Sequence, residues 1–175
     1  IAEAGDLAHV LTIGEATRGA AVLATGVSGV RAMRGEDRVH VTVVGNSYGS
    51  TTVAIAADEF ALEADDVVLT GSPGAGRADD AAELTSGRAH TWVGSASDDP
   101  VSYLGRTGGA EPHDLVEFVA DGVVGLGRDP AEDDFGAQRF GAEWVGRDDE
   151  FPWSLDGHGH YFDPCAEAPD NIGAI

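Results

Sequence analysis

The sequence predicts an α/β fold in which helices cover both faces of a mainly parallel sheet. Short apolar runs rich in β-branched residues alternate with longer segments that have the spacing of helices. The runs are apolar on both faces, as expected of strands buried in a parallel sheet. A chain of 175 residues with no internal repeat and no convincing linker fits a single domain over residues 1–175.

The first part of the chain predicts a strand between two helices. Ala, Leu and Val recur at three- and four-residue spacing over residues 7–33, which indicates a helix although several glycines weaken it. Residues 39–44 (VHVTVV) predict a central parallel strand. After a serine flanked by glycines, residues 51–62 (TTVAIAADEFAL) predict the second helix. Together these segments form a strand–turn–helix unit.

Shorter elements are expected in the middle of the chain. Residues 67–70 and 89–94 predict two further buried strands, and residues 80–86 predict a short helix between them. The third strand runs into residues 95–105, where Pro100 and small polar residues indicate a loop.

The last part of the chain predicts one more helix and one more strand. Residues 111–125 have helical spacing, with Pro112 near the first turn. Residues 139–146 (RFGAEWVG) predict a final short strand, followed by a loop up to a segment that holds two histidines. The C-terminal residues 169–175 are too few to assign.

The charge of the chain excludes several classes of partner. Thirty-one acidic residues face ten basic ones, all of them Arg, for a net charge of −21. Such a charge repels phosphate backbones and anionic lipid, so we expect neither nucleic acid nor a membrane surface as a partner. No apolar run is long enough to predict a membrane span. The acids are scattered in twos and threes, which favours adaptation to salt, or a high-GC genome, over a cation-binding patch.

The segment VTVVGNSYGSTTVAIAA holds the strongest candidate for a catalytic residue. Ser47 lies between a predicted strand and a predicted helix, with Gly45 two residues before it and Gly49 two residues after it. A nucleophile elbow needs this order, and its turn is too tight for side chains at the flanking positions. A phosphate-binding glycine loop fits less well because the Lys of a P-loop is absent. We therefore predict that Ser47 is a nucleophile.

A serine nucleophile needs a base, and the base needs an acid that orients it. The order expected along the chain after such an elbow is Ser, then Asp or Glu, then His. Asp98 and Asp99 follow the third predicted strand, and His158 and His160 come later. The order is therefore complete, with two candidates each for the acid and the base.

Five motifs, taken in order, resemble an actinobacterial α/β-hydrolase family described as a domain of unknown function. They are VTVVGNSYGSTT, VVLTGSPGAG, SASDDPV, DDFGAQRF and HGHYFDP…NIGAI, and the resemblance covers the chain from about residue 10 to the C-terminus. The resemblance implies a mainly parallel α/β-hydrolase sheet. It implies Ser47 as the nucleophile, Asp99 before Pro100 as the acid, and His158, three residues before Tyr161, as the base.

The chain departs from the motifs of this family at two positions. Asn46 stands where the family usually has His, which predicts changed packing beside the nucleophile rather than lost activity. Gly159 replaces the usual Ser after the base, which leaves the loop less constrained and keeps His160 as an alternative base. Asp98 likewise stays an alternative to Asp99 as the acid.

The implied reaction is hydrolysis of an ester or related carbonyl in a small-molecule substrate, without a cofactor. The backbone N–H of Tyr48 is expected to be one oxyanion donor. The second donor follows an early strand of such a sheet, and the chain begins near the helix that should come after that strand. We therefore expect the 175 residues to be the C-terminal portion of the domain, without its N-terminal strands or that donor. Losing one donor costs roughly 10²–10³ in rate.

A non-catalytic binding scaffold with the same fold is the alternative function, and the complete Ser–Asp–His order favours the enzyme. Cys165, the only cysteine, has acidic, turn-like surroundings and is expected to be a packing residue. His158 and His160 with Asp156 or Asp163 lack a further His or Cys partner, so no metal is expected. The remaining histidines, His9, His40, His90 and His113, are expected to be structural. Substrate identity and oligomeric state stay open, and the cytoplasm is favoured as the compartment.

Overall fold

The fold was analysed in a computed structural model. It describes residues 13–35, 39–85, 89–102, 126–144 and 156–175. The predicted helix over residues 111–125 lies outside the described residues, as do His9, His113 and the beginning of the first predicted helix.

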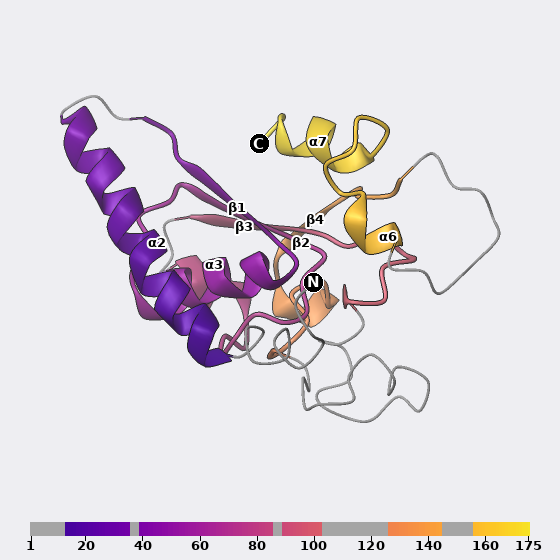
Figure 1. Ribbon diagram of the computed structural model, residues 1–175, viewed down its shortest axis with the longest axis horizontal. Helices are drawn as coiled ribbons and strands as arrows, with labels where there is room; N and C mark the ends of the chain where they lie inside the picture. Colours follow the sequence, from indigo (N-terminus) through magenta and orange to yellow (C-terminus); the bar gives the residue numbers. More distant parts are fainter. Residues whose placement is uncertain (1–12, 36–38, 86–88, 103–125, 145–155) are drawn as a thin grey trace, which may run out of the picture.

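Four parallel strands form one sheet in the described part of the chain (Figure 1). They are β1 (Thr42–Asn46), β2 (Asp66–Thr70), β3 (His90–Gly94) and β4 (Gln138–Phe140), and they lie side by side in that order. The register pairs Asn46 with Thr70 and Thr70 with Gly94, so the carboxyl ends of β1, β2 and β3 meet at one edge of the sheet. The predicted parallel sheet is confirmed.

The strands differ in burial according to their place in the sheet. All five residues of β2 are buried, as its position between two strands requires. β1, predicted as a central strand, pairs within the described residues with β2 alone, and Val44 is 39% exposed. The fourth predicted strand is shorter than expected: β4 ends at Phe140, and Trp144 instead forms an isolated antiparallel bridge with Ala166.

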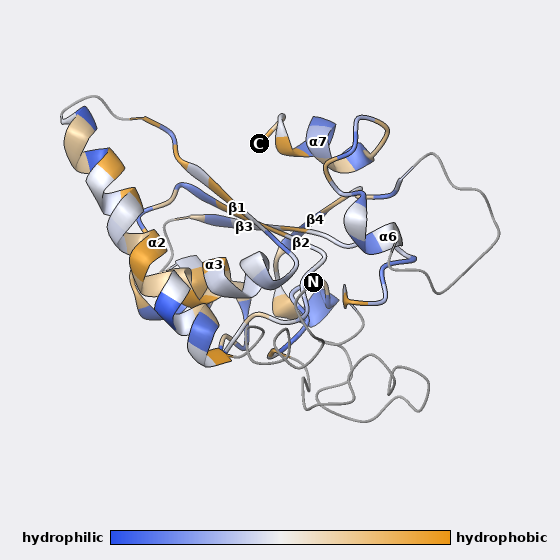
Figure 2. Cartoon of the chain, in the orientation of Figure 1, coloured by the Kyte–Doolittle hydropathy of each residue, from blue (hydrophilic) through white to orange (hydrophobic). Residues whose placement is uncertain are grey.

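Two long helices pack together on one side of the sheet. α3 (Tyr48–Glu59) lies between the sheet and α2 (Ile13–Arg34), and Figure 2 shows apolar stretches along α3 and on the part of α2 beside it. Ala16 and Ala20 are fully buried against Ile55 and Ala56, because small side chains let two helices approach closely. The short α4 (Ala81–Thr85) adds Leu84 to the main core.

The C-terminal elements cover the opposite side of the sheet. They are α6 (Asp156–Gly159) and α7 (Glu167–Ile172), and Figure 1 shows α7 across the strands from α3. A separate core joins Tyr161 and Ala168 to Ala96 and Ala142, which follow β3 and β4. Helices therefore flank both faces of the sheet, as predicted. No helix in the described ranges has the length and apolar character needed to cross a bilayer.

The net charge of −21 predicts that stability depends on salt. Among the acids whose burial is described, Asp66, Asp99 and Asp129 are buried and the others are at least partly exposed. Repulsion between surface carboxylates weakens the compact state, and salt screens it by shortening the Debye length from about 30 Å at 0.01 M to about 3 Å at 1 M. We expect the midpoint of thermal unfolding to rise continuously with NaCl over this range.

Calcium chloride at matched ionic strength is the control for this prediction. General screening gives a similar midpoint with both salts at the same ionic strength. A cation-binding patch would instead give a calcium effect that saturates at low concentration. A midpoint that falls as NaCl rises would contradict the expected effect.

Candidate active site

Ser47 occupies a sharp turn between β1 and α3. Its backbone has φ 55° and ψ −132°, a left-handed conformation that is costly for any residue other than glycine. Two hydrogen bonds hold the turn: Ser47 N–H donates to the Thr70 carbonyl at 2.9 Å, and Ser50 N–H donates to the Ser47 carbonyl at 2.9 Å. Because this turn reverses the chain at once, α3 begins at Tyr48 rather than at the predicted residue 51.

The two glycines that flank Ser47 differ in the space around them. A Cβ on Gly45 would lie 2.6 Å from the Gly49 carbonyl oxygen and 2.7 Å from Ser50 Cα, both of them backbone atoms. A Cβ on Gly49 would meet no described atom within 4 Å. The prediction that no side chain fits is therefore confirmed at Gly45, where β1 and α3 touch. It is wrong at Gly49, where a Cβ has space.

His158 lies between Ser47 and a buried carboxylate. It stands in α6, and its Nε2 is 2.6 Å from Ser47 Oγ. On the other side of the ring, Nδ1 is 3.0 Å from each carboxylate oxygen of Asp99. With the Nδ1–H facing the carboxylate, Nε2 is the acceptor for the serine hydroxyl. The structure therefore brings together the three side chains that the resemblance implied.

Asp99 is fully buried and has hydrogen-bond donors on both oxygens. Oδ1 accepts from the Val101 N–H at 2.8 Å, and Oδ2 accepts from the Tyr161 hydroxyl at 2.7 Å. A buried charge needs such partners, because water is not there to solvate it. These two hydrogen bonds therefore hold the carboxylate in place independently of its contact with His158.

The neighbouring Asp98 packs against Gly157, the residue directly before His158. A Cβ on Gly157 would lie 2.8 Å from Asp98 Cγ, so this side chain packs against the backbone at the beginning of α6. The contacts to His158 Nδ1 come from Asp99. Of the two candidate acids, the structure places Asp99 against the imidazole.

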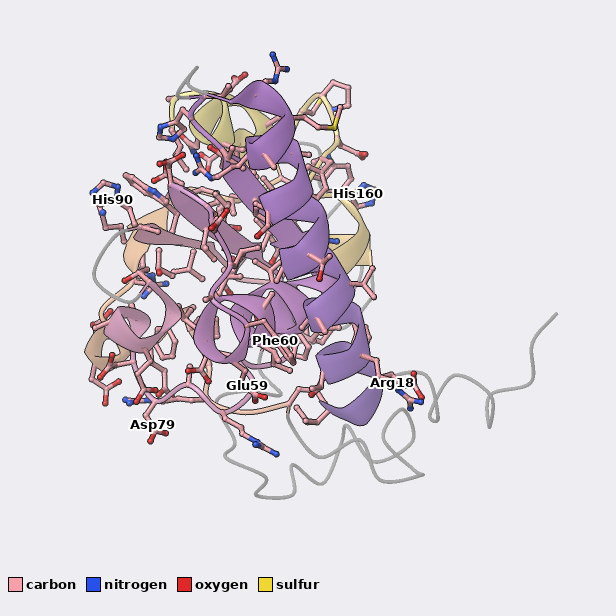
Figure 3. The ribbon with its side chains drawn as sticks, turned by 90° about the vertical axis from the view of Figure 1, so that its left-hand side faces the viewer. Arg18, Glu59, Phe60, Asp79, His90 and His160 are labelled. Atoms are coloured by element: carbon pink, nitrogen blue, oxygen red, sulfur yellow. The ribbon has the colours of Figure 1, made fainter. Side chains whose placement is uncertain are left out.

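His160, the alternative base, has other partners. Its Nδ1 is 2.5 Å from Asp163 Oδ2, and its ring stacks on Trp144 with centroids 4.2 Å apart and planes 10° apart. The structure therefore places His158, rather than His160, next to Ser47. Figure 3 shows His160 and His90 on opposite sides of the molecule in that view.

Gly71 is the point on which the acid, the base and Tyr161 converge. Its φ is +53°, and a Cβ there would lie 2.7 Å from Tyr161 Cε2, 2.9 Å from Asp99 Oδ2 and 3.2 Å from His158 Cε1. The sequence used Gly71 only as part of a Gly-Ser-Pro-Gly motif after the second strand. The motif marked Gly71 in the sequence but did not explain it. Glycine is required there because Asp99 and His158 occupy the space that a side chain would need.

Tyr48 and Asn46 flank Ser47 on the chain. The amide of Tyr48 belongs to the first turn of α3, where the helix carries positive partial charge. Burial raises the pKa of the Tyr48 phenol, whose ring packs against the core between α2 and α3. Asn46 Oδ1 accepts from the Thr70 hydroxyl at 2.9 Å, so its side chain is tied to β2.

The segment that carries His158 is fastened to the loops after β3 and β4. Glu143 accepts hydrogen bonds from the amide and the hydroxyl of Ser97, at 3.0 and 3.1 Å. Glu167 in turn accepts from the Glu143 amide at 3.1 Å, and Asn171 donates to the Gly141 carbonyl at 2.7 Å. These bonds tie α7 to the loop after β4, and that loop to the loop that leads to Asp99.

The other candidate groups lie away from Ser47. His40 and His90 both pair with the buried Asp66 at the amino end of β2, which is the opposite end from Ser47. Cys165 is exposed. Within the described ranges, no group of three or more His, Cys, Asp or Glu side chains is arranged to hold a metal ion.

Comparison with known proteins identifies the family. A family model described as alpha/beta hydrolase matches residues 2–108. Two curated relatives, the Uncharacterized proteins MT2140 and Rv2079 from two strains of Mycobacterium tuberculosis, are each 38% identical over 161 residues. That alignment covers 90% of this chain and 24% of each relative, so the chain spans about a quarter of their length. No solved structure matches the chain. The family match extends over more than half of the residues and agrees with the parallel sheet, and the chain therefore belongs to the alpha/beta hydrolase family.

Proposed function

We propose that the chain is a serine hydrolase that cleaves ester bonds in a small-molecule substrate. Ser47 is the nucleophile, His158 the general base and Asp99 the acid that orients it. The observation that carries the proposal is the unbroken chain of hydrogen bonds from Ser47 Oγ through both imidazole nitrogens to Asp99. Membership of an alpha/beta hydrolase family supports the same reaction class.

The reaction follows from the positions of these atoms. His158 Nε2 takes the hydroxyl proton while Ser47 Oγ attacks the carbonyl carbon, and Asp99 stabilises the imidazolium that forms. The imidazolium then gives the proton to the leaving alkoxide, which departs as an alcohol and leaves an acyl-enzyme. A water molecule, deprotonated by His158, then attacks the acyl carbonyl carbon. The bond to Ser47 Oγ breaks, the imidazolium returns the proton to Oγ, and the acid departs.

The oxyanion of each tetrahedral intermediate needs donors that are already in place. The Tyr48 amide, directly after the nucleophile at the beginning of α3, is the proposed first donor. The left-handed backbone of Ser47 supports this role, because it turns the chain so that the helix begins beside the nucleophile. The second donor, expected from a loop after an earlier strand, stays a prediction.

A fluorophosphonate probe on the full-length protein tests the proposal. This probe reacts with a serine only when a base activates it, so wild type should be labelled. Ser47→Ala should abolish labelling, and His158→Ala should reduce it by about 10³-fold or more. His160→Ala is the matched control, since His160 is engaged with Asp163 and Trp144, and it should be labelled as wild type is. A folded wild type that resists the probe would overturn the proposal in favour of a binding scaffold.

A further inference from the structure

Tyr161 connects the base-bearing segment to the acid. It follows His158 by three residues, and its side chain is only 1% exposed. The ring lies in the core formed with Ala96, Ala142 and Ala168, which joins the ends of β3 and β4 to α7. This packing buries the ring, and the hydroxyl at its end lies beside Asp99.

The hydrogen bonds of this hydroxyl have a defined direction. The Ala96 N–H donates to Tyr161 Oη at 2.9 Å, and Tyr161 Oη donates to Asp99 Oδ2 at 2.7 Å. A hydroxyl has one hydrogen, and a backbone N–H can donate but not accept. The amide of Ala96 therefore leaves the phenolic hydrogen to the carboxylate.

Two donors on different oxygens prevent rotation of the carboxylate. Val101 N–H holds Oδ1 at 2.8 Å, and the Tyr161 hydroxyl holds Oδ2 at 2.7 Å. With both oxygens held, each lies 3.0 Å from His158 Nδ1. Without the phenolic hydrogen, the imidazole would be the one partner of Oδ2 among the described residues, and the carboxylate would be freer to turn about its Cβ–Cγ bond.

The Tyr161 phenol keeps its proton, and with it its role as a donor, at neutral and mildly alkaline pH. Burial, and after it the charge of Asp99, raise the pKa of the Tyr161 phenol far above its ordinary value. An ionised phenolate could not donate, and it would repel the carboxylate. The upward shift keeps the hydrogen on the oxygen at neutral and mildly alkaline pH.

We propose that Tyr161 is a positioning residue for the hydrolysis reaction, which fixes the Asp99 carboxylate against His158. Its hydroxyl acts through the acid, and its ring meets the His158 ring edge to face, with centroids 6.3 Å apart. Because Phe would keep that ring contact, the hydroxyl can be tested by itself. The proposal rests on the proposed function, because the position of Asp99 matters to rate only if His158 is the base. This role for Tyr161, which belongs to the motif HGHYFDP, could not be predicted from its spacing along the chain.

Tyr161→Phe is the sharp test, because it keeps the ring and removes the hydroxyl. A misplaced acid should slow fluorophosphonate labelling by about 10- to 100-fold. A carboxylate that has lost one donor presents more of its charge to the imidazole, which favours the protonated, non-basic ring. The acidic limb of the labelling rate against pH should therefore move to higher pH in the variant.

Thr51→Val is the matched control. Thr51 is fully buried, and its hydroxyl donates to the Gly74 carbonyl at 2.7 Å, away from the acid and the base. This variant also loses one buried hydroxyl and its hydrogen bond, so its stability should fall by a similar amount. Its acidic limb should coincide with that of wild type, because no contact of Asp99 or His158 changes.

A second measurement does not depend on activity. The proton between His158 Nδ1 and Asp99 should give a low-field NMR resonance in the full-length protein, assigned by its loss in His158→Ala. This resonance should shift or broaden in Tyr161→Phe and stay unchanged in Thr51→Val. A wild type that resists the probe would overturn the proposed function, while the resonance would still report whether Tyr161 fixes the pair. If wild type is labelled and Tyr161→Phe keeps both its acidic limb and its resonance, the positioning role is wrong and the hydrolase stands.

Discussion

Asp99→Asn should lower the rate of fluorophosphonate labelling at neutral pH by about 10⁴-fold. The loss comes from the tautomer of the base. The Asp99 carboxylate accepts the Nδ1–H of His158 and leaves Nε2 as the acceptor for the Ser47 hydroxyl. An amide nitrogen facing Nδ1 would donate instead, which favours a proton on Nε2. That imidazole can no longer take the proton of Ser47.

The surroundings of Asp99 make this loss hard to avoid. The side chain is fully buried, and donors from Val101 and Tyr161 already occupy its two oxygens. An asparagine would have to turn its NH₂ group toward one of these donors or toward the imidazole. Because the site is buried from solvent, each choice costs a hydrogen bond.

Asp98→Asn is the matched control for this prediction. It makes the same chemical change one residue earlier, in a side chain that packs against Gly157. The labelling rate should stay within about tenfold of wild type, since the hydrogen bonds between the acid and the base are kept. Thermal unfolding of both variants separates loss of rate from loss of fold. A large loss in Asp98→Asn with little change in Asp99→Asn would reverse the assignment of the acid.

The sequence predicted those parts of the fold and site that depend on local pattern. The apolar runs of β2 and β3 identified the strands, because both lie inside the sheet and are largely buried. The turn at Ser47 could be predicted because strand, turn and helix are contiguous. The limits of β1 and β4 were less accurate, since both are edge strands of the described sheet and periodicity marks such strands less clearly.

The choices between neighbouring candidates could not be predicted in the same way. Asp98 and Asp99 are adjacent on a loop, and Asp98 packs against Gly157. Hydrogen bonds from Val101 and Tyr161 hold Asp99 beside His158. The stacking of Trp144 likewise occupies His160 and leaves His158 for Ser47. These contacts join segments that are distant along the chain, so no local pattern carries them. The family resemblance pointed to Asp99 and His158 because it rests on whole motifs in order, rather than on single residues.

Gly45→Ala should destabilise the fold and disable the nucleophile together. The new methyl group would meet the Gly49 carbonyl oxygen at 2.6 Å and Ser50 Cα at 2.7 Å. Both are backbone atoms in the first turn of α3, so no side chain can move aside to make room. We expect a loss of about 3 kcal/mol or more in the free energy of unfolding, which lowers the thermal midpoint by roughly 6–12 °C.

The same displacement should act on the reaction. Ser47 lies between the two elements that the methyl group would separate, and its hydroxyl is 2.6 Å from His158 Nε2. A shift of about 1 Å in such a contact costs on the order of 10²-fold in rate. Labelling by the fluorophosphonate should therefore fall by at least that factor in the fraction of Gly45→Ala that remains folded, as measured by circular dichroism below the midpoint.

Gly49→Ala tests whether glycine is required by contact between β1 and α3 or at both glycine positions of the motif. Both glycines belong to the Gly-x-Ser-x-Gly pattern, but a Cβ on Gly49 would meet no described atom within 4 Å. Gly49 also has helical backbone in α3, where alanine stabilises by up to about 1 kcal/mol relative to glycine. This variant should keep or gain stability and keep its labelling rate. Equal damage from both substitutions would mean that contact between β1 and α3 is not what requires glycine before the nucleophile.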